Sequence, residues 1–486
     1  MRALEAVMVG HNDLVGAEED WSMFPLEEES ESEDVEGRTE GEGPPTVSQE
    51  KLDKLDAIAA LEEIQKLNQM KVIEPLEMDP REIPPECLVD TTVAKDWRYR
   101  QGWKRRCRIV AREYRMNQNT DENTHSPTSA FAAVRILLIL RMIYDLAVTA
   151  LDIKDAFLVV PQPEDEPMLV LIPEWIQALQ PECQHNIWRL RRCLPGQRSA
   201  AQHWFAFFTR LCKKAGMDSF PGCPTVLKFV DKDHHIYLTV HVDDVLLVCD
   251  DKDLKWFQKN VAKELTTKVD GPHQQGSGKT MMYLKKRITF LDEGTLIQPN
   301  NTYIPKLIEP LKLAGGRKKG LPHHSTVDAY HPDQPGLDEL TEEEVKSFRS
   351  ALGLILYISH DRPDINFATK VISTWMARPC GKAMAGVKHS ALDLSGTEHG
   401  GVLLKKCEEH ENVFDRWIES GDWMEFDTKK QKTKPILNLD VFAGSSWGDD
   451  RGTRKSTRFF NSFFQWCICA WFFSNPSNSC TQLMRS

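Results

Sequence analysis

The chain has 486 residues, of which 41% are hydrophobic and 9% aromatic, enough apolar material for two or three globular domains. Its formal net charge of −11 is unfavourable for a protein that binds nucleic acid. However, twelve acidic residues against one arginine lie between Glu18 and Glu42, and the remainder is roughly neutral. The stretch from Lys95 to Arg115 holds nine Lys or Arg against two acids, which makes it a candidate phosphate-binding surface.

Signals for export or membrane insertion are weak. The N-terminal residues turn acidic almost at once and lack the basic-then-apolar order of a secretory signal. The twelve cysteines form no CxxC pairs at zinc spacing, so we expect reduced thiols in an intracellular protein, cytoplasmic or nuclear. The apolar stretch Phe459–Phe473 is about five residues short of a membrane span and is interrupted by polar residues. We expect a buried strand pair there and no membrane partner.

The chain begins with an acidic segment followed by a helix. Residues 1–50 are rich in Glu, Ser, Gly and Pro and hold too little apolar surface to offset the entropy of ordering, which predicts disorder. Residues 51–92 form a predicted helical lead-in, because apolar residues recur every three positions from Leu52 to Leu67. We expect this amphipathic helix to dock on the domain that follows.

Residues 93–316 alternate segments of strand and helix type. Strands are predicted at CRIVAREY, AVTALDIKDAFLVV and HIYLTVHVDDVLLVCD, and helices at AFAAVRILLILRMIYDL and AAQHWFAFFTRLCKKAG. This order predicts an α+β fold with helices on one face of a sheet. After a Gly/Pro/His-rich linker at 317–345, residues 346–415 read as helical, with a break near Arg362 and Pro363. Residues 435–486 are predicted to form strands.

Three carboxylates stand where strands end. Asp243 and Asp244 lie at a predicted turn between two apolar strands, and Asp152 follows the apolar run AVTAL. Converging from separate strands, they would provide the hard oxygen ligands of a two-Mg²⁺ site, where Mn²⁺ could substitute. The plainer alternative is that Asp243 and Asp244 only decorate a solvated hairpin turn, which is the usual role of such a pair.

The neighbouring motifs favour the metal site. LDIKDAFL, LPGQRSAAQHWF and HVDDVLLVCD resemble, in order and spacing, three polymerase motifs of copia-type (Pseudoviridae) LTR-retrotransposon reverse transcriptases. RCRIVAREY, YLKKRITF and RSALGLILYISHDRPDINFATKVIS are similar to further segments of that family, so the resemblance runs from about Ile64 onward. It implies right-hand polymerase fingers and palm with an antiparallel palm sheet at 93–316. A helical thumb or connection would follow at 346–415, with a truncated ribonuclease H-like segment at 435–486.

The resemblance assigns roles to single residues. It implies that Asp152 and Asp243 are the principal metal ligands, with Asp244 as the third acid and the backbone of Ile153 as a further ligand. Phe157 matches a steric gate that would exclude a ribose 2′-hydroxyl. The nucleotide-binding residues implied are Arg106, Arg108, Phe157, Gly196 and Arg198, and the nucleic-acid-binding residues are Lys104, Arg105 and Arg112. Each single arginine is equally well read as a solvated surface charge.

Several residues depart from the family pattern. His241 stands where tyrosine is usual, Pro195 where tyrosine precedes the glycine, and Lys285 where a glycine would let the backbone approach the primer. Gly444 occupies the position of a ribonuclease H aspartate, so we expect that nuclease activity to be absent. The mixture is typical of a fragment of a degenerate polyprotein.

Two functions follow from these residues. The first is an RNA-directed DNA polymerase with Mg²⁺, whose partners are an RNA template, a DNA primer and deoxynucleoside triphosphates. The alternative is a catalytically inactive retrotransposon relic that acts at most as a nucleic-acid-binding protein through the basic stretch, with a salt-dependent affinity. The oligomeric state is open.

Overall fold

The structure is a computed structural model that describes residues 44–84, 88–99, 102–113, 126–127, 129, 131–180, 186–220, 223–325, 327, 338–406, 439–445, 458–464 and 467–472. The segment predicted to be disordered, 1–50, lies mostly outside the described residues. The chain divides into two compact units. Unit 1 comprises Met1–Val134 and Ala150–Asp270, and unit 2 comprises Arg135–Thr149 and Gly271–Ser486.

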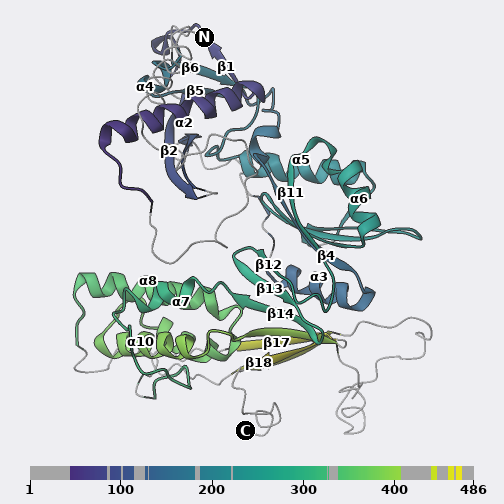
Figure 1. Ribbon diagram of the computed structural model, residues 1–486, viewed down its shortest axis with the longest axis vertical. Helices are drawn as coiled ribbons and strands as arrows, with labels where there is room; N and C mark the ends of the chain where they lie inside the picture. The colour runs from purple at the N-terminus through teal and green to yellow at the C-terminus, as the bar shows by residue number, and fades with distance from the viewer. Residues whose placement is uncertain are drawn as a thin grey trace. The chain divides into compact units, whose positions relative to one another are not determined.

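One half of unit 1 is a helix packed on a five-stranded sheet (Figure 1). Helix α2 spans Gln49–Gln69, with the Ser48 hydroxyl accepting from the amide of Lys51 at its N-cap. The sheet order is β1-β6-β5-β2-β3, from strands β1 (Ile73–Leu76), β2 (Leu88–Tyr99), β3 (Trp103–Ala111), β5 (Leu169–Leu171) and β6 (Ile187–Leu190). Ile64 and Leu67 of α2 share a buried core with Ile109 of β3. The predicted docking of the amphipathic helix is therefore confirmed, but the lead-in predicted over 51–92 is α-helical only as far as Gln69 before β1 and β2 follow.

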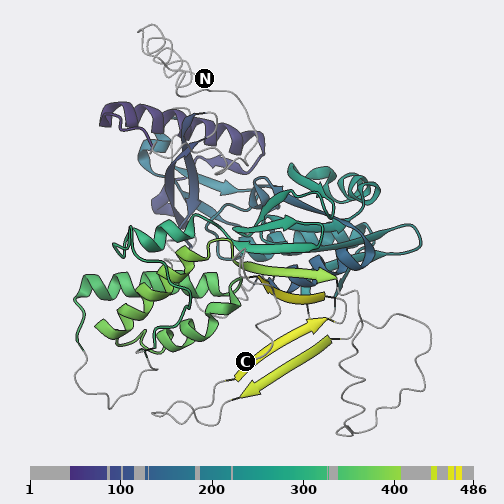
Figure 2. The same ribbon diagram turned by 60° about the horizontal axis from the view of Figure 1, so that its bottom comes forward.

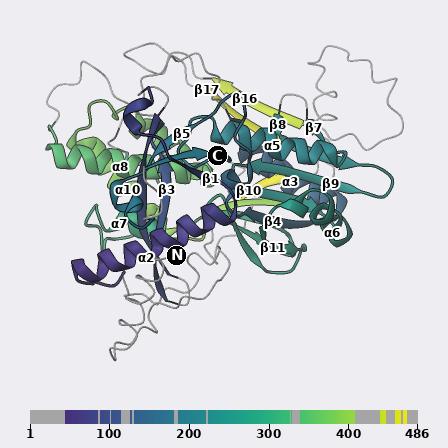
Figure 3. The same cartoon turned by 90° about the horizontal axis from the view of Figure 1, so that it is seen from above.

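The other half of unit 1 holds most of a six-stranded sheet in the order β11-β4-β10-β9-β8-β7 (Figure 3), of which the first residues of β4 and the last of β11 are assigned to unit 2. Its strands are β4 (Ala147–Ile153), β7 (Asp218–Phe220), β8 (Cys223–Val230), β9 (His235–His241), β10 (Asp244–Cys249) and β11 (Thr267–His273). Helices α5 (Ala200–Lys214) and α6 (Asp251–Asn260) bury Trp204, Phe208 and Phe257 in one core with alternate residues of these strands. Because alternate strand residues point to one face, both helices cover the same face, as the sequence predicts.

Short helices complete unit 1. They are η2 (Pro80–Glu82), η5 (Ala156–Val159), α4 (Glu174–Gln177) and η6 (Ala262–Glu264). Of these, η5 follows β4 directly and carries the residue predicted to act as a steric gate.

Unit 2 combines a sheet with a group of helices (Figure 2). Its helices are α3 (Phe131–Tyr144), α7 (Tyr303–Ile308), α8 (Glu342–Ser359), η7 (Pro363–Ile365), α9 (Asn366–Ser373) and α10 (Gly381–Gly396). The predicted break at Arg362 and Pro363 is confirmed, because α8 ends before these residues and α9 begins after them. Helix α8 starts earlier than 346, at a capping box between Thr341 and Glu344. The region predicted as helical to residue 415 also contains a strand, β15 (Gly401–Lys406).

The sheet of unit 2 has the order β12-β13-β14-β15-β18-β17-β16. Its strands are β12 (Thr280–Tyr283), β13 (Lys286–Phe290), β14 (Gly294–Pro299), β15 (Gly401–Lys406), β16 (Leu439–Ser445), β17 (Arg458–Phe464) and β18 (Cys467–Phe472). The stretch Phe459–Phe473 thus holds two strands, as predicted, and no described helix is long and apolar enough to cross a membrane. Pairing of β14 with β15, Ile297 opposite Val402, places β12–β14 in unit 2, although the sequence groups them with residues 93–316.

Candidate active site

A tight hairpin and a neighbouring strand bring the predicted carboxylates together. Strands β9 and β10 pair with His241 opposite Asp244, which leaves Val242 and Asp243 as the turn. Strand β4 lies next to β10, and the backbone N–H of Ile153 donates to the carbonyl oxygen of Asp243 at 3.0 Å. Asp152 precedes Ile153 on β4, so its carboxylate belongs to the same sheet edge as the Asp243–Asp244 turn.

The charges of the three carboxylates interact with one another. Burial, together with the nearby charges of Asp243 and Asp152, raises the pKa of Asp244 to about 7. In the part of the chain that the structure describes, no three His, Cys, Asp or Glu side chains are gathered closely enough to hold a metal ion as they stand. The carboxylates are therefore near enough to repel one another, but their side chains do not converge on one metal position.

The turn has an unusual backbone and a buried partner. Val242 has a φ of 55°, a left-handed conformation that a β-branched residue rarely adopts. The indole N–H of Trp204 donates to the Val242 carbonyl oxygen at 2.5 Å, and Trp204 is only 1% exposed. Helical spacing with Phe207 and Phe208 predicts packing for Trp204, and both rings do lie against it. The pattern gave no sign of the hydrogen bond, because the acceptor lies 38 residues further along the chain.

The predicted gate residue lies just beyond β4. Phe157 is in η5, whose N-cap Asp155 has a φ of 51°, and its ring packs against the core beneath α5 and α6. The guanidinium of Arg192 donates to the carbonyl oxygens of Leu158 at 3.4 Å and Val159 at 3.2 Å. These bonds fix the backbone that carries the Phe157 ring.

The loop with Gly196 and Arg198 is tied to the end of β3. Gly196 has a φ of 89°, and a Cβ built there would lie 2.1 Å from the carbonyl oxygen of Ala111. The Ala111 N–H donates to the Pro195 oxygen at 2.8 Å, and the Arg198 N–H donates to a Glu113 carboxylate oxygen at 2.7 Å. Gly196 thus has a structural requirement for close packing, whatever its contact with a nucleotide.

Comparison with known proteins adds a family to this geometry. Residues 84–323 match the family model described as Reverse transcriptase (RNA-dependent DNA polymerase). The Retrovirus-related Pol polyprotein from transposon TNT 1-94 of Nicotiana tabacum is 25% identical over 297 residues, covering 60% of this chain and 22% of that polyprotein. Residues 84–323 belong to the reverse transcriptase family.

Other relatives of this reverse transcriptase region carry similar names. The Pol polyprotein from transposon RE1 of Arabidopsis thaliana is 23% identical over 313 residues, and that from transposon RE2 is 22% identical over 302 residues. Each of these two alignments covers 62% of this chain and 20% of the polyprotein. The chain therefore spans about a fifth of the length of these curated relatives.

Acidic residues of α2 form ion pairs with residues of β2 and β3 in the basic stretch from Lys95 to Arg115. Arg105 lies 2.5 Å from a carboxylate oxygen of Asp56, Lys95 lies 2.8 Å from the other, and Lys104 lies 3.4 Å from Glu62. Burial would raise the pKa of Asp56, but the hydrogen bonds from Arg105 and Lys95 outweigh it and lower that pKa. The sequence did not predict these ion pairs.

The remaining basic residues differ in surroundings. Arg108 is exposed and Arg106 half-buried, at alternate positions of β3, and the backbone N–H of Arg112 donates to the Asp90 oxygen at 2.7 Å. Contact of Arg106, Arg108 or Arg112 with phosphate stays a prediction. So does contact through Lys104 and Arg105, which would compete with their ion pairs.

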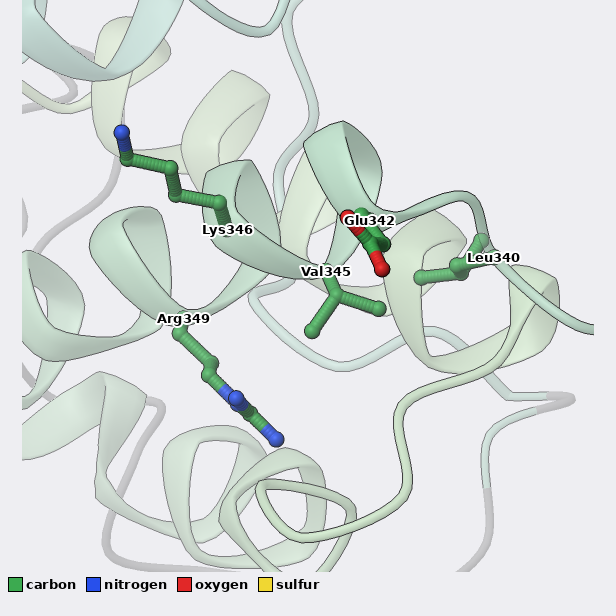
Figure 4. Close-up of a pocket in the computed structure, with 5 residues that line it drawn as sticks. All are labelled: Leu340, Glu342, Val345, Lys346 and Arg349. Atoms are coloured by element: carbon green, nitrogen blue, oxygen red, sulfur yellow. The ribbon is translucent and has the colours of Figure 1, made fainter.

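A hollow of about 380 Å³ lies in unit 2 (Figure 4). It is lined by Leu340, Glu342, Val345, Lys346 and Arg349 at the start of α8. Because it contains none of the carboxylates and none of the predicted nucleotide-binding residues, we do not place the active site there.

Proposed function

We propose that this chain is an RNA-directed DNA polymerase of a copia-type retrotransposon, which extends a DNA primer along an RNA template. One observation carries the proposal: the hydrogen bond from the Ile153 N–H to the Asp243 oxygen, at 3.0 Å, joins the strand of Asp152 to the hairpin that carries Asp243 and Asp244. Carboxylates from two separate strands at one sheet edge are what nucleotidyl transfer with divalent ions requires.

The donor set suits Mg²⁺. Asp152, Asp243 and the carbonyl of Ile153 supply hard oxygen ligands, with Asp244 as the third acid. The repulsion that helps raise the pKa of Asp244 is the kind that a divalent cation offsets. When bound, two Mg²⁺ ions, or Mn²⁺, would lower the pKa of the primer 3′-hydroxyl and neutralise charge on the leaving pyrophosphate.

Residues near the carboxylates would select and hold the nucleotide. We assign Phe157 the exclusion of a ribose 2′-hydroxyl, because η5 presents it within five residues of Asp152 and fixes its backbone. Arg198 and the exposed Arg108 are suited to phosphate oxygens, since a guanidinium can donate two parallel hydrogen bonds. The implied substrates are deoxynucleoside triphosphates.

The test is incorporation of deoxynucleotides by the full chain on a primed RNA template with Mg²⁺. The double variant Asp243→Asn, Asp244→Asn should lose incorporation by a factor of about 10³ or more, as expected when charge stabilisation in the transition state is removed. Asp251→Asn serves as the matched control, because Asp251 is exposed at the start of α6 near the same sheet. Equal incorporation by all three proteins would contradict the assignment of the carboxylates.

The relic remains the alternative outcome of the same experiment. A folded wild-type chain that binds the RNA/DNA hybrid with a steep salt dependence, yet incorporates nothing, would establish it. The ion pairs of Lys104 and Arg105 with α2 disfavour it, because they engage charge that non-specific binding needs. Ribonuclease H activity should be absent in either case, since Gly444 of β16 supplies no carboxylate.

A further inference from the structure

A lysine of the lead-in helix reaches the segment that carries the predicted gate. Lys66 of α2 lies with its Nζ 3.0 Å from a carboxylate oxygen of Asp155 and 2.8 Å from one of Glu63. The side chains of Lys66, Asp155 and Glu63 are 28%, 22% and 10% exposed, so this contact is shielded from solvent more than a surface ion pair. Lys66 and Asp155 are 89 residues apart in sequence.

Asp155 holds a strained position between the metal-binding strand and the gate. Its φ of 51° and ψ of 40° place a non-glycine residue in the left-handed region. Its carbonyl oxygen accepts from the Leu158 N–H at 2.8 Å, which closes the first turn of η5 around Phe157. Such a conformation persists only when neighbouring groups hold it, and Lys66 is one such group.

Packing links the same two segments independently. Leu158 of η5 is buried in one core with Ile64 and Leu67 of α2, whereas Phe157 packs against the core of the six-stranded sheet. The segment η5 therefore spans two cores, and α2 contributes both the apolar contact and the charge on one side. Helix α2 lies before residue 84, outside the matched reverse transcriptase region.

We propose that Lys66 is a positioning residue that holds Asp155, and through it Phe157, so that α2 sets how strictly the site separates deoxynucleotides from ribonucleotides. This inference rests on the proposed polymerase function. Without the ammonium group, Asp155 and Glu63 lose the cation that pairs with both carboxylates, and η5 is free to shift away from α2. A shift of the Phe157 ring opens space for a 2′-hydroxyl.

The first measurement requires no catalysis. Hydrogen exchange of the full chain reports on the Leu158 and Val160 amides, which donate within η5. Lys66→Met should speed exchange in residues 156–160, whereas Lys66→Arg, which keeps a cation, should restore most of the protection. Lys54→Met is the matched control, because Lys54 pairs with Glu50 on the same helix but at a solvent-exposed site. Unchanged exchange in Lys66→Met would overturn the proposal.

The second measurement is the ratio of kcat/KM for a deoxynucleotide to that for the matching ribonucleotide. We expect Lys66→Met to lower this ratio by about tenfold, mainly through faster ribonucleotide incorporation, and Lys66→Arg to recover it. A mere loss of stability would lower both rates together and leave the ratio unchanged, which would contradict a positioning role.

The two proposals fail in different ways. Incorporation by the wild-type chain with an unchanged ratio in Lys66→Met would leave the polymerase standing and overturn the role of Lys66. No incorporation by the wild-type chain would overturn the polymerase, and with it the discrimination assigned to Lys66.

Discussion

Two hairpins, one in each unit, turn through residues that strain the backbone. In unit 1, β9 and β10 turn through Val242, with a φ of 55°, and Asp243. In unit 2, β12 and β13 turn through Leu284 and Lys285, with φ of 47° and 59°. Two-residue turns with positive φ normally use Gly or Asn, and neither turn contains one.

An aromatic side chain donates a hydrogen bond to the backbone of each turn, but the two donors differ in burial. The buried Trp204 donates to the Val242 oxygen at 2.5 Å, whereas the partly exposed Tyr357 donates to the Leu284 oxygen at 3.1 Å. At the base of the second hairpin, Lys286 forms a buried ion pair with Asp361. An aromatic donor thus holds each strained carbonyl. The acids Asp243 and Asp244 lie at the first turn, whereas the second turn lies next to the ion pair of Lys286 and Asp361.

Breaking the buried ion pair of the second hairpin should have the largest effect. Asp361→Asn leaves the Lys286 ammonium without its carboxylate in a site that excludes water, and unit 2 should lose about 3–5 kcal/mol in free energy of unfolding. Urea denaturation measures the loss. The guanidinium of Arg135, which is 30% exposed, also lies 3.7 Å from Asp361. The double variant Lys286→Met, Asp361→Asn removes both charges of the buried pair and should recover much of the loss; no recovery would mean that shape, or the contact of Asp361 with Arg135, limits the site.

A second buried acid near this anchor should behave in the opposite way. Burial, opposed by Arg362 and assisted by Asp364, raises the pKa of Asp393 from 3.8 to about 6. The folded state therefore binds the proton more tightly, so stability falls as the pH rises from about 4 to 6 and the cost is constant above that window. Asp393→Asn should raise the free energy of unfolding at pH 7 by up to about 3 kcal/mol.

Thermal unfolding at several pH values checks the Asp393 prediction. The gain of Asp393→Asn over the wild type should shrink below pH 6 and vanish only well below pH 3.8, where the wild-type carboxyl is protonated in both states. A gain that is constant with pH would mean that the amide acts by packing.

Removing the indole N–H that donates to the first hairpin should affect both stability and nucleotide incorporation. Trp204→Phe keeps an aromatic ring but leaves the Val242 oxygen without the indole N–H, at a cost of about 1–3 kcal/mol in free energy of unfolding. Because the turn carries Asp243, incorporation should fall as well. Tyr357→Phe is the comparison: it removes the equivalent bond at Leu284 and should cost less, since Tyr357 is exposed.

Relieving strain in the second hairpin should have the smallest effect. Glycine adopts a φ of 59° without strain, so Lys285→Gly removes the energy of the left-handed backbone. Glycine also gains conformational entropy in the unfolded state, which offsets part of this effect. The free energy of unfolding should therefore rise by up to about 1 kcal/mol. The shift in the midpoint of thermal unfolding measures it. A loss of stability would mean that the Lys285 side chain makes a contact worth more than the strain.

Local patterns were sufficient to predict the elements of the sheet that carries Asp152, Asp243 and Asp244. Apolar runs on both sides of Asp243 and Asp244 predicted the hairpin, and the three-residue spacing from Leu52 to Leu67 predicted α2; both are confirmed. Periodicity succeeds here because the face that a strand or helix buries is set by residues adjacent in sequence. The roles of Arg106, Arg108 and Phe157 toward a nucleotide stay predictions.

The sequence by itself determined the family motifs, the hairpin with its two acids and the break at Pro363, because each depends on neighbouring residues. Only the tertiary structure decided that Trp204 holds Val242, that Gly196 packs against Ala111 and that Lys66 reaches Asp155. Each of these contacts joins residues far apart in the chain, where burial and distance are set by how whole elements pack. No spacing rule along the sequence carries that information.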